Sequence, residues 1–182
     1  RTAVVSPDRS HKGILLIDKD QVTVVPVDIC FPVLHGKHGE DGTIQGLFQL
    51  AGIPFVGCNM ISSANCMDKE MTHTILEANG IKMAKWVIVN GEKMNDFENF
   101  AKDAEEKLGY PMFVKPANAG SSVGVGKAHN REELKSACET ALKEDYKAVV
   151  EECIEMQEVE TAVLGNGDPK AAGVVGELVP VV

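Results

Sequence analysis

The sequence predicts a globular α/β protein: its composition indicates the globular class, and two patterns along the chain support the α/β fold. The chain has 182 residues, of which 44% are apolar and 25% charged, as is typical of a soluble globular protein with one large or two small domains. Residues 28–58 follow the order strand, glycine-rich loop, helix, strand, which indicates an open α/β sheet. Beyond residue 61, helical and strand patterns alternate along the chain.

The charge balance and the hydropathy pattern disfavour two classes of partner. The chain carries 27 acidic and 18 basic side chains, for a net charge of -9, and binding to nucleic acid depends largely on Lys and Arg. Apolar runs are far shorter than the roughly 20 residues of a spanning helix, and no signal-peptide pattern opens the chain. We therefore expect a cytoplasmic protein with no nucleic-acid or membrane partner.

Cysteine and histidine spacing gives little support for a metal site. The five cysteines are an odd count without a C-x-x-C pair, and each lies beside apolar residues, which favours buried free thiols over ligands or disulfides. His35 and His38 lie three residues apart but lack further ligands at suitable spacing. We expect no metal-binding residue in this sequence.

The first sixty residues predict strands around one helix. Runs at 2–6, 13–18 and 21–28 are rich in β-branched residues and separated by turn residues, which predicts hairpin strands. Residues 28–36 form a continuous apolar run, as in a parallel strand buried on both faces. We then expect a helix from about Thr43 to Leu50 and a strand over 53–58. His35 ends the apolar run, where it is either a core histidine or a hydrogen-bond partner for a ligand.

The rest of the chain predicts alternating helices and strands. A helix runs from Ser62 to about 79, with apolar residues at spacings of three and four and Gly80 as its C-cap. Helices over 95–109 and 131–145 each have one apolar face. Strands are predicted over 85–89, 111–117, 122–128, 148–154, 159–165 and 171–179, with a tight turn at 118–121. Composition changes from strand-rich to helical near 59–63, where we expect a domain seam.

The segment FVKPANAGSSVGVGKA combines a cation with an anion-binding type of loop. Lys115 lies between Val114 and Pro116 on an apolar strand, so it needs an anionic partner if it is buried. The Gly-Ser-Ser sequence that follows could direct backbone N–H groups and hydroxyls toward phosphate. The segment matches neither a Walker A loop nor a GxGxxG fingerprint. Taken alone, it is equally well a hairpin with a flexible turn.

Two further places could bind a nucleotide. In VVEECIEMQEVE, carboxylates follow an apolar strand, which suits a purine and ribose pocket but is also common in acidic loops. Lys69 lies near the start of its predicted helix, where the helix dipole disfavours a cation unless an anion offsets it. An exposed lysine is the ordinary alternative.

These pieces together resemble a known family. The motifs HGKHGEDGTIQG, SSANCMDKE, YPMFVKPANAGSSVGV and VVEECIEMQEVETAVLG are similar, in order and separation, to those of D-alanine-D-alanine ligases, including the vancomycin-resistance ligases that make D-Ala-D-Ser or D-Ala-D-lactate. The resemblance spans nearly the whole chain. It implies an ATP-grasp enzyme that converts the carboxylate of D-alanine to an acyl phosphate and joins it to a second D-amino or D-hydroxy acid. The product is a peptidoglycan precursor.

The resemblance also implies the roles of particular residues. Lys69 and Lys115 would hold the phosphates of ATP, and Gly120, Ser121 and Ser122 would close over them. Glu151, Glu152 and Ile154 would line the adenine site, and Glu158 would bind the ribose. His35 and Ser121 would lie beside the first D-alanine as catalytic residues. One departure is Glu152, where many relatives carry Lys.

The same resemblance predicts how much of the ligase the chain contains. Residues 1–60 would be the later part of an open α/β N-terminal domain, 61–150 the α+β central ATP-grasp domain, and 151–182 the first strands of the C-terminal domain. The chain would lack both ends of the family fold, so magnesium ligands are expected beyond Val182. We also expect a homodimer. The alternative interpretations are a non-catalytic ATP-grasp-like module that binds nucleotide, and an ATP-grasp ligase for another carboxylate.

Overall fold

The computed structural model describes residues 1–179 of the chain. The chain forms two compact units, Arg1–Glu152 and Cys153–Val182. Within the described residues, no helix is both long enough and apolar enough to cross a membrane.

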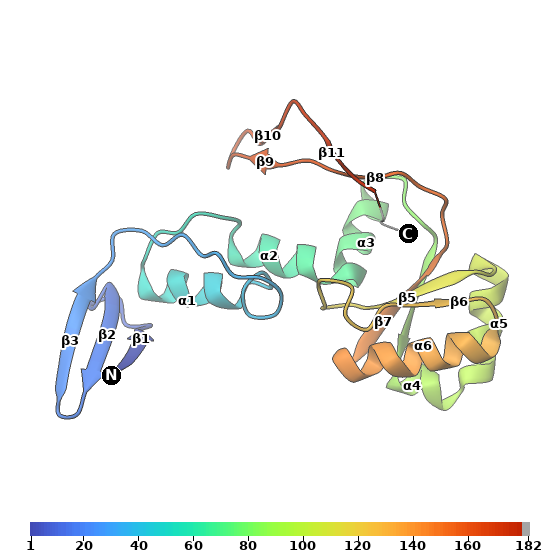
Figure 1. The fold of residues 1–182 in the computed structure, drawn as a ribbon, viewed down its shortest axis with the longest axis horizontal. Coiled ribbons are helices and arrows are strands. Elements are labelled where there is room, and N and C mark those ends of the chain that lie inside the picture. Colours follow the sequence, from blue (N-terminus) through green and yellow to red (C-terminus); the bar gives the residue numbers. More distant parts are fainter. Residues whose placement is uncertain (180–182) are drawn as a thin grey trace. The chain divides into compact units, whose positions relative to one another are not determined.

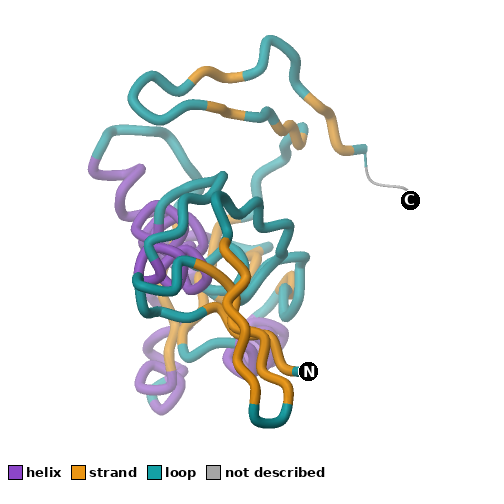
Figure 2. The backbone as a smooth tube through the Cα atoms, turned by 90° about the vertical axis from the view of Figure 1, so that its left-hand side faces the viewer, coloured by secondary structure: helices purple, strands orange, loops and turns teal. Residues whose placement is uncertain are grey.

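Three antiparallel strands open the first unit. They are β1 (Thr2–Val5), β2 (Gly13–Asp18) and β3 (Gln21–Pro26), paired in the order β1-β2-β3. Thr2 lies opposite Ile17, and Ile14 opposite Val25. Figure 2 shows them as neighbouring orange segments near the N-terminus. The hairpin strands predicted from the β-branched runs are confirmed.

The strand predicted over 28–36 does not form. Its only β-pairing among the described residues is an isolated parallel bridge between Cys30 and Phe55. The strand predicted over 53–58 does not form either, and this bridge is its only β-pairing within residues 1–179. Phe31 and Val33 are 73% and 71% exposed. A continuous apolar run becomes a strand only where a neighbouring strand satisfies its backbone, and the strand-like backbone hydrogen bonds of this run are those of Cys30 with Pro54 O and Val56 N.

Helix α1 (Thr43–Ala51) is present as predicted, but the long helix expected from Ser62 is two helices. These are α2 (Met60–Met67) and α3 (Lys69–Ala78). Asp68 separates them in an extended conformation, and its side chain accepts hydrogen bonds from the N–H groups of Glu70 and Met71. An aspartate that caps a new helix in this way competes with continuation of the old one. Gly80 follows α3 with a φ of 70°, as expected of a residue that ends a helix.

A four-stranded antiparallel sheet holds the largest core. Its order is β4 (Trp86–Asn90), β7 (Lys147–Glu152), β5 (Met112–Pro116) and β6 (Gly126–Ala128). Helices α4 (Gly91–Asn95), α5 (Phe97–Leu108) and α6 (Arg131–Glu144) follow β4 and β6, and α5 and α6 pack beside the strands (Figure 1). The predicted helix 95–109 therefore begins after a short separate helix. The apolar faces predicted for α5 and α6 lie in the core, where Phe97, Phe100, Leu134 and Cys138 are buried.

Strand alternation divides the sheet into two faces. Met112 and Val114 of β5 and Val150 of β7 point into the core with α5 and α6. Because successive side chains point to opposite faces, Lys115 and Glu151 lie on the other face of the sheet. That second face carries the charged residues of the candidate site.

The second unit contains two small antiparallel pairs. Strand β8 (Glu158–Glu160) pairs with β11 (Gly176–Leu178), and β9 (Val163–Leu164) pairs with β10 (Lys170–Ala171). The strands predicted over 159–165 and 171–179 are thus present as shorter segments.

All five cysteines are free, but they are not all buried. Cys138 is buried in the core, whereas Cys58 and Cys66 are exposed and Cys30 and Cys153 are intermediate. The expectation of buried thiols was wrong for Cys58 and Cys66, because both flank or lie on α2, of which only Ser63 is buried.

Candidate functional site

Lys69 is the first residue of α3 and is half-buried against the loop that follows β5. Its backbone N–H donates to Ala117 O at 3.0 Å, and its Nζ donates to Ala119 O at 2.6 Å. Burial and then the nearby ammonium group of Lys115 lower the pKa of Lys69, against the opposing effect of Glu151 and other carboxylates. The two lysines predicted to hold phosphate therefore lie near each other.

Lys115 has an anionic partner within the chain. Its Nζ lies 2.6 Å from Oε2 of Glu151, whose side chain is only 10% exposed. Lys115 is opposite Val149 in the β5–β7 register, and Glu151 is the diagonal neighbour two residues along. The sequence argument that a lysine here needs an anion is thus satisfied by a carboxylate of the protein itself.

The loop after β5 is longer than the predicted tight turn. It extends from Ala117 to Val125, and β6 begins only at Gly126. Ser121 and Ser122 are exposed and have φ values of 50° and 58°. Two successive non-glycine residues in the left-handed region store conformational strain, which is frequent at ligand-binding loops.

A buried charged network fixes the start of α3 to the sheet. Lys147 Nζ lies 2.8 Å from Asp68 Oδ2 and 2.5 Å from Glu70 Oε2. Although burial opposes ionisation of Asp68, its hydrogen bonds with Lys147, the backbone of Met71 and Asn118 lower its pKa. Burial likewise opposes the charge of Lys147, yet the two carboxylates raise its pKa.

Asn118 extends this network into the loop. Its Nδ2 donates to Asp145 Oδ2 at 2.9 Å, and its backbone N–H donates to the same oxygen at 2.8 Å. Sequence reasoning missed the network. The signal that could have found it is the one used for Lys115, since Lys147 also lies on an apolar strand.

The residues assigned to adenine and ribose lie in different parts of the chain. Glu151 and Glu152 end β7, and Glu152 pairs with Lys85 twice: its N–H donates to Lys85 O at 3.0 Å, and its Oε1 accepts from Lys85 N at 2.8 Å. Ile154 and Glu158 are exposed residues of the second unit. Within the first unit, the structure brings together Lys69, Lys115 and Glu151.

The glycine-rich segment folds around its own carboxylates. Glu40 Oε2 accepts from Gly36 N, and Asp41 accepts from His38 N at 2.8 Å and Thr43 N at 3.0 Å. Burial opposes the charge of Asp41, but hydrogen bonds from the side chain of Thr43 and from the backbone of His38 and Thr43 lower its pKa. His35 is exposed.

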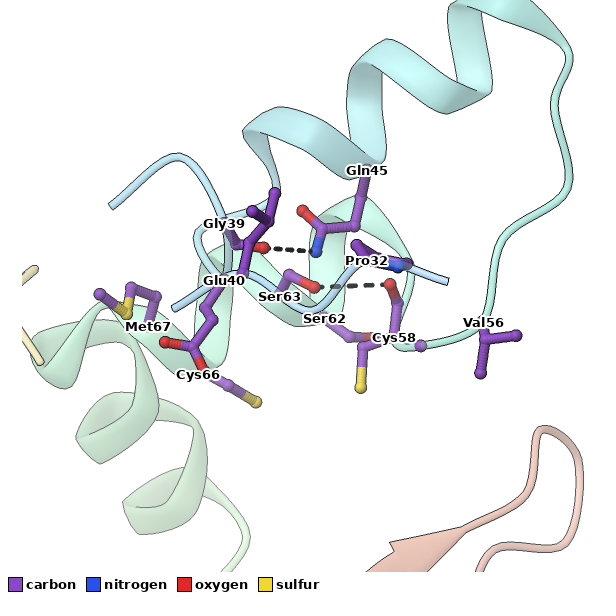
Figure 3. A pocket seen from close by; sticks show the side chains of 12 residues that line it. Pro32, Gly39, Glu40, Gln45, Val56, Cys58, Ser62, Ser63, Cys66 and Met67 are labelled. Carbon is purple, nitrogen blue, oxygen red and sulfur yellow. Dashed lines mark hydrogen bonds between the residues drawn. The ribbon is translucent and has the colours of Figure 1, made fainter. Parts of the chain in front are cut away.

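A pocket of about 420 Å³ lies beside this segment, and Figure 3 shows its lining. Gln45 is buried there; its Nε2 donates to Gly39 O at 2.9 Å, while its Oε1 has no hydrogen-bond partner within residues 1–179. Glu40 also lines the pocket, and His35 does not. Among residues 1–179, no hydrogen bond or ion pair joins His35 to Lys69 or Lys115.

Residues 1–179 do not provide a site that fits magnesium. They contain no group of three or more His, Cys, Asp or Glu side chains that could hold a metal ion.

Comparison with known proteins gives two family matches. The family model described as "D-ala D-ala ligase C-terminus" matches residues 75–181, and "D-ala D-ala ligase N-terminus" matches residues 3–58. Among curated proteins, the chain is 46% identical over 178 residues to a D-alanine--D-alanine ligase of Thermoanaerobacter sp. (strain X514), covering 98% of this chain and 49% of the relative. A D-alanine--D-alanine ligase of Clostridium acetobutylicum is 53% identical over 155 residues, covering 85% and 45%.

Solved structures agree with these matches. The VanG D-Ala:D-Ser ligase from Enterococcus faecalis superposes with a TM-score of 0.85 at 45% identity, covering 96% of this chain and 49% of that one. The D-alanine-D-alanine ligase from Coxiella burnetii gives a TM-score of 0.81 at 34% identity, covering 92% and 50%. The chain spans about half the length of these relatives. The resemblance and the fold class predicted from the sequence are confirmed.

Proposed function

Because the chain belongs to the D-alanine–D-alanine ligase family, we propose that the protein is an ATP-dependent ligase that joins D-alanine to a second D-amino or D-hydroxy acid through an acyl phosphate. The product would serve as a peptidoglycan precursor. The observation that supports this most is the placement of Lys69 and Lys115 beside the serine-bearing loop, with Glu151 next to them.

In this proposal, the two ammonium groups bind the phosphates of ATP. They would neutralise charge as the phosphoryl group moves to the carboxylate of D-alanine, which is the main source of rate in such transfers. The Gly120–Ser122 segment, whose two serines are exposed, would close over the phosphates, with Ser121 beside the first substrate. His35 would bind the substrate amino acid.

The adenosine contacts are assigned by the same comparison with the family. Glu151, Glu152 and Ile154 would line the adenine site, and Glu158 would bind the ribose. Glu152 already uses its side chain on Lys85 N and its backbone N–H on Lys85 O. We retain the domain division 1–60, 61–150 and 151–182 as part of the proposal.

Several finer properties are also proposals. The match to a D-Ala:D-Ser ligase supports D-serine as a candidate second substrate, and the matches to D-alanine--D-alanine ligases support D-alanine. D-lactate as the second substrate and a link to vancomycin resistance remain predictions. Five free thiols and the acidic composition support a cytoplasmic protein. A requirement for magnesium and a homodimeric state remain predictions.

The direct test is phosphate release by the full-length protein. Incubation with ATP, magnesium and D-alanine should release inorganic phosphate and form a dipeptide detectable by mass spectrometry. D-serine and D-lactate should be supplied in parallel as second substrates. Absence of release with every D-amino acid and D-hydroxy acid would contradict the proposal.

One alternative is favoured by a specific observation. The chain covers about half of its relatives, and residues 1–179 offer no metal cluster, so these 182 residues by themselves could be a nucleotide-binding module without turnover. If this chain binds nucleotide without releasing phosphate while the full-length protein turns over, then binding is assigned to these 182 residues and turnover to the full-length protein. An ATP-grasp ligase for another carboxylate would instead show no response to D-alanine.

Lys115→Ala should abolish ATP binding while leaving the fold intact. The matched control is Lys127→Ala, because Lys127 Nζ also lies over the Phe113 ring, at 5.5 Å against 5.9 Å for Lys115, but does not contact Glu151. Calorimetric titration with a nonhydrolysable ATP analogue measures the effect. Equal affinities in the two variants would show that Lys115 has been misassigned.

Glu152→Lys should leave ATP affinity nearly unchanged. The substitution removes the side-chain bond to Lys85 N but keeps the backbone bond from Glu152 N to Lys85 O. We expect the dissociation constant for the ATP analogue to stay within about threefold of the original. A change of that size is smaller than the usual contribution of one hydrogen bond. A larger loss would assign a role to the Glu152 carboxylate.

A further inference from the structure

Helix α3 presents two side chains to the charged face of the sheet. Lys69 and His73 are four residues apart and so lie on the same side of the helix, one turn apart. Lys69 reaches the loop through Ala119, whereas His73 reaches β7 through Glu151. His73 has no role in the function proposed above.

The imidazole of His73 is held on all sides. Its Nε2 lies 2.9 Å from Glu151 Oε1, its Nδ1 lies 3.3 Å from Met83 Sδ, and its ring centroid lies 5.3 Å from that of Trp86. Only 15% of its side chain is exposed. Because an ionised carboxylate only accepts hydrogen bonds, Nε2 must carry the hydrogen in this contact.

Glu151 stands between two donors. His73 binds Oε1 and Lys115 binds Oε2, so each carboxylate oxygen has its own partner. The terminal torsion of a glutamate is broad, and one donor alone would leave the carboxylate plane free to turn. With two donors from two elements, α3 and β5, the plane is fixed, and so is the position of the Lys115 ammonium group.

We propose that His73 is a positioning residue, which holds Glu151 in the orientation that places Lys115 for the nucleotide. The inference rests on the proposed role of Lys115 in ATP binding. It explains why a polar side chain occupies a nearly buried place between Trp86, Met83 and the sheet. The relevant group is the hydrogen-bond donor at Nε2.

The test compares three substitutions in the full-length protein. His73→Leu removes the donor, and the KM for ATP should rise about tenfold, equal to about 1.4 kcal/mol, since a hydrogen bond to a charged group is lost. The KM for D-alanine should not change. His73→Gln places an amide N–H near the position of Nε2 and should return the KM for ATP to within about threefold of the original. His73→Asn, whose amide is shorter, should not.

His129 provides the matched control. Its Nδ1 lies 2.9 Å from Glu133 Oε2, the same distance as in the His73 pair, but its side chain is 61% exposed and it does not contact Lys115. His129→Leu should leave both KM values unchanged. The melting temperature of each variant, measured alongside, reports on the fold.

Four outcomes decide the proposal. A rise in the KM for ATP alone, reversed by glutamine but not by asparagine, supports it. An unchanged KM for ATP in His73→Leu, while Lys115→Ala loses ATP, overturns the inference and leaves the proposed function standing. A parallel rise in both KM values, with equal defects in the glutamine and asparagine variants, shows a merely structural role and also overturns it. Failure of the unsubstituted protein to bind ATP overturns the proposed function itself.

Discussion

Lys147→Met should destabilise the first unit strongly. The substitution keeps most of the side-chain volume of a residue that is 7% exposed but removes its ammonium group. Asp68 and Glu70 then lose the cation that lies 2.8 Å and 2.5 Å from their oxygens. Two carboxylates remain close together at the start of α3, and one of them caps that helix.

The size of the effect follows from burial. Removing one partner of a buried ion pair costs about 3–5 kcal/mol, whereas exposed pairs contribute about 0–1 kcal/mol. The side chains of Asp68 and Glu70 are 15% and 33% exposed, so these pairs lie between buried and exposed ion pairs but nearer the buried ones. We expect a loss of about 3 kcal/mol in the free energy of unfolding, or about 6–12 °C in melting temperature for a chain of this size.

Urea denaturation at neutral pH measures this change, with Lys143→Met, an exposed lysine of α6, as the control. The pKa of Asp68 is lowered from its ordinary 3.8, so its contribution is complete above that pH and is lost as pH falls through the folded-state value. The pKa of Lys147 is raised from 10.5, so its contribution is complete below that pH and is lost as pH rises through the folded-state value.

The difference between the original protein and Lys147→Met should therefore be constant from about pH 5 to 9 and should shrink in acid, where the carboxylates become protonated. Equal unfolding free energies for Lys147→Met and Lys143→Met would refute the reasoning. So would a difference that grows as pH falls toward the pKa of Asp68.

Two further predictions concern backbone geometry and thiol reactivity. Gly42→Ala should lower the free energy of unfolding by about 1–3 kcal/mol, because Gly42 has a φ of 89° and an added Cβ would lie 2.5 Å from Met60 O. An unchanged midpoint of urea denaturation would contradict this. A thiol reagent should label the exposed Cys58 and Cys66 in the native protein, but Cys138 only on unfolding, because burial raises its pKa to about 12. Peptide mapping after timed labelling measures this, and equal labelling rates for the three thiols would count against it.

Local patterns in the sequence predicted most of the helices and strands around the core. The helices α5 and α6 predicted from their apolar spacing are confirmed, because each buries one stripe of apolar side chains. The helical period of the apolar residues in the sequence indicates such a stripe directly. The break at Asp68 was missed, since the apolar spacing continues through it while the side chain caps a new helix. The strand over 28–36 was wrong because strand formation depends on a partner that the run itself does not specify.

The candidate site shows the same limit. The chemical argument for an anion near Lys115 was sound, but only the β5–β7 register identifies Glu151 as a diagonal neighbour. His73 gave no sequence signal, because its contact with Glu151 spans 78 positions of the chain. Residue chemistry indicated what kinds of partner were needed, and tertiary contacts decided which residues supplied them.

The division at Asp68 has an evolutionary consequence for Lys69. In one continuous helix, each inserted or deleted residue would rotate everything downstream by about 100° around the axis, and a lysine there would soon face the wrong way. Since α3 begins afresh at Lys69 and its first N–H is bonded to Ala117 O, the length of α2 does not set the direction of this side chain. Insertions or deletions before Asp68 therefore leave the direction of the Lys69 side chain unchanged. Insertions or deletions between residues 69 and 73 would instead rotate His73 away from the side of the helix that carries Lys69.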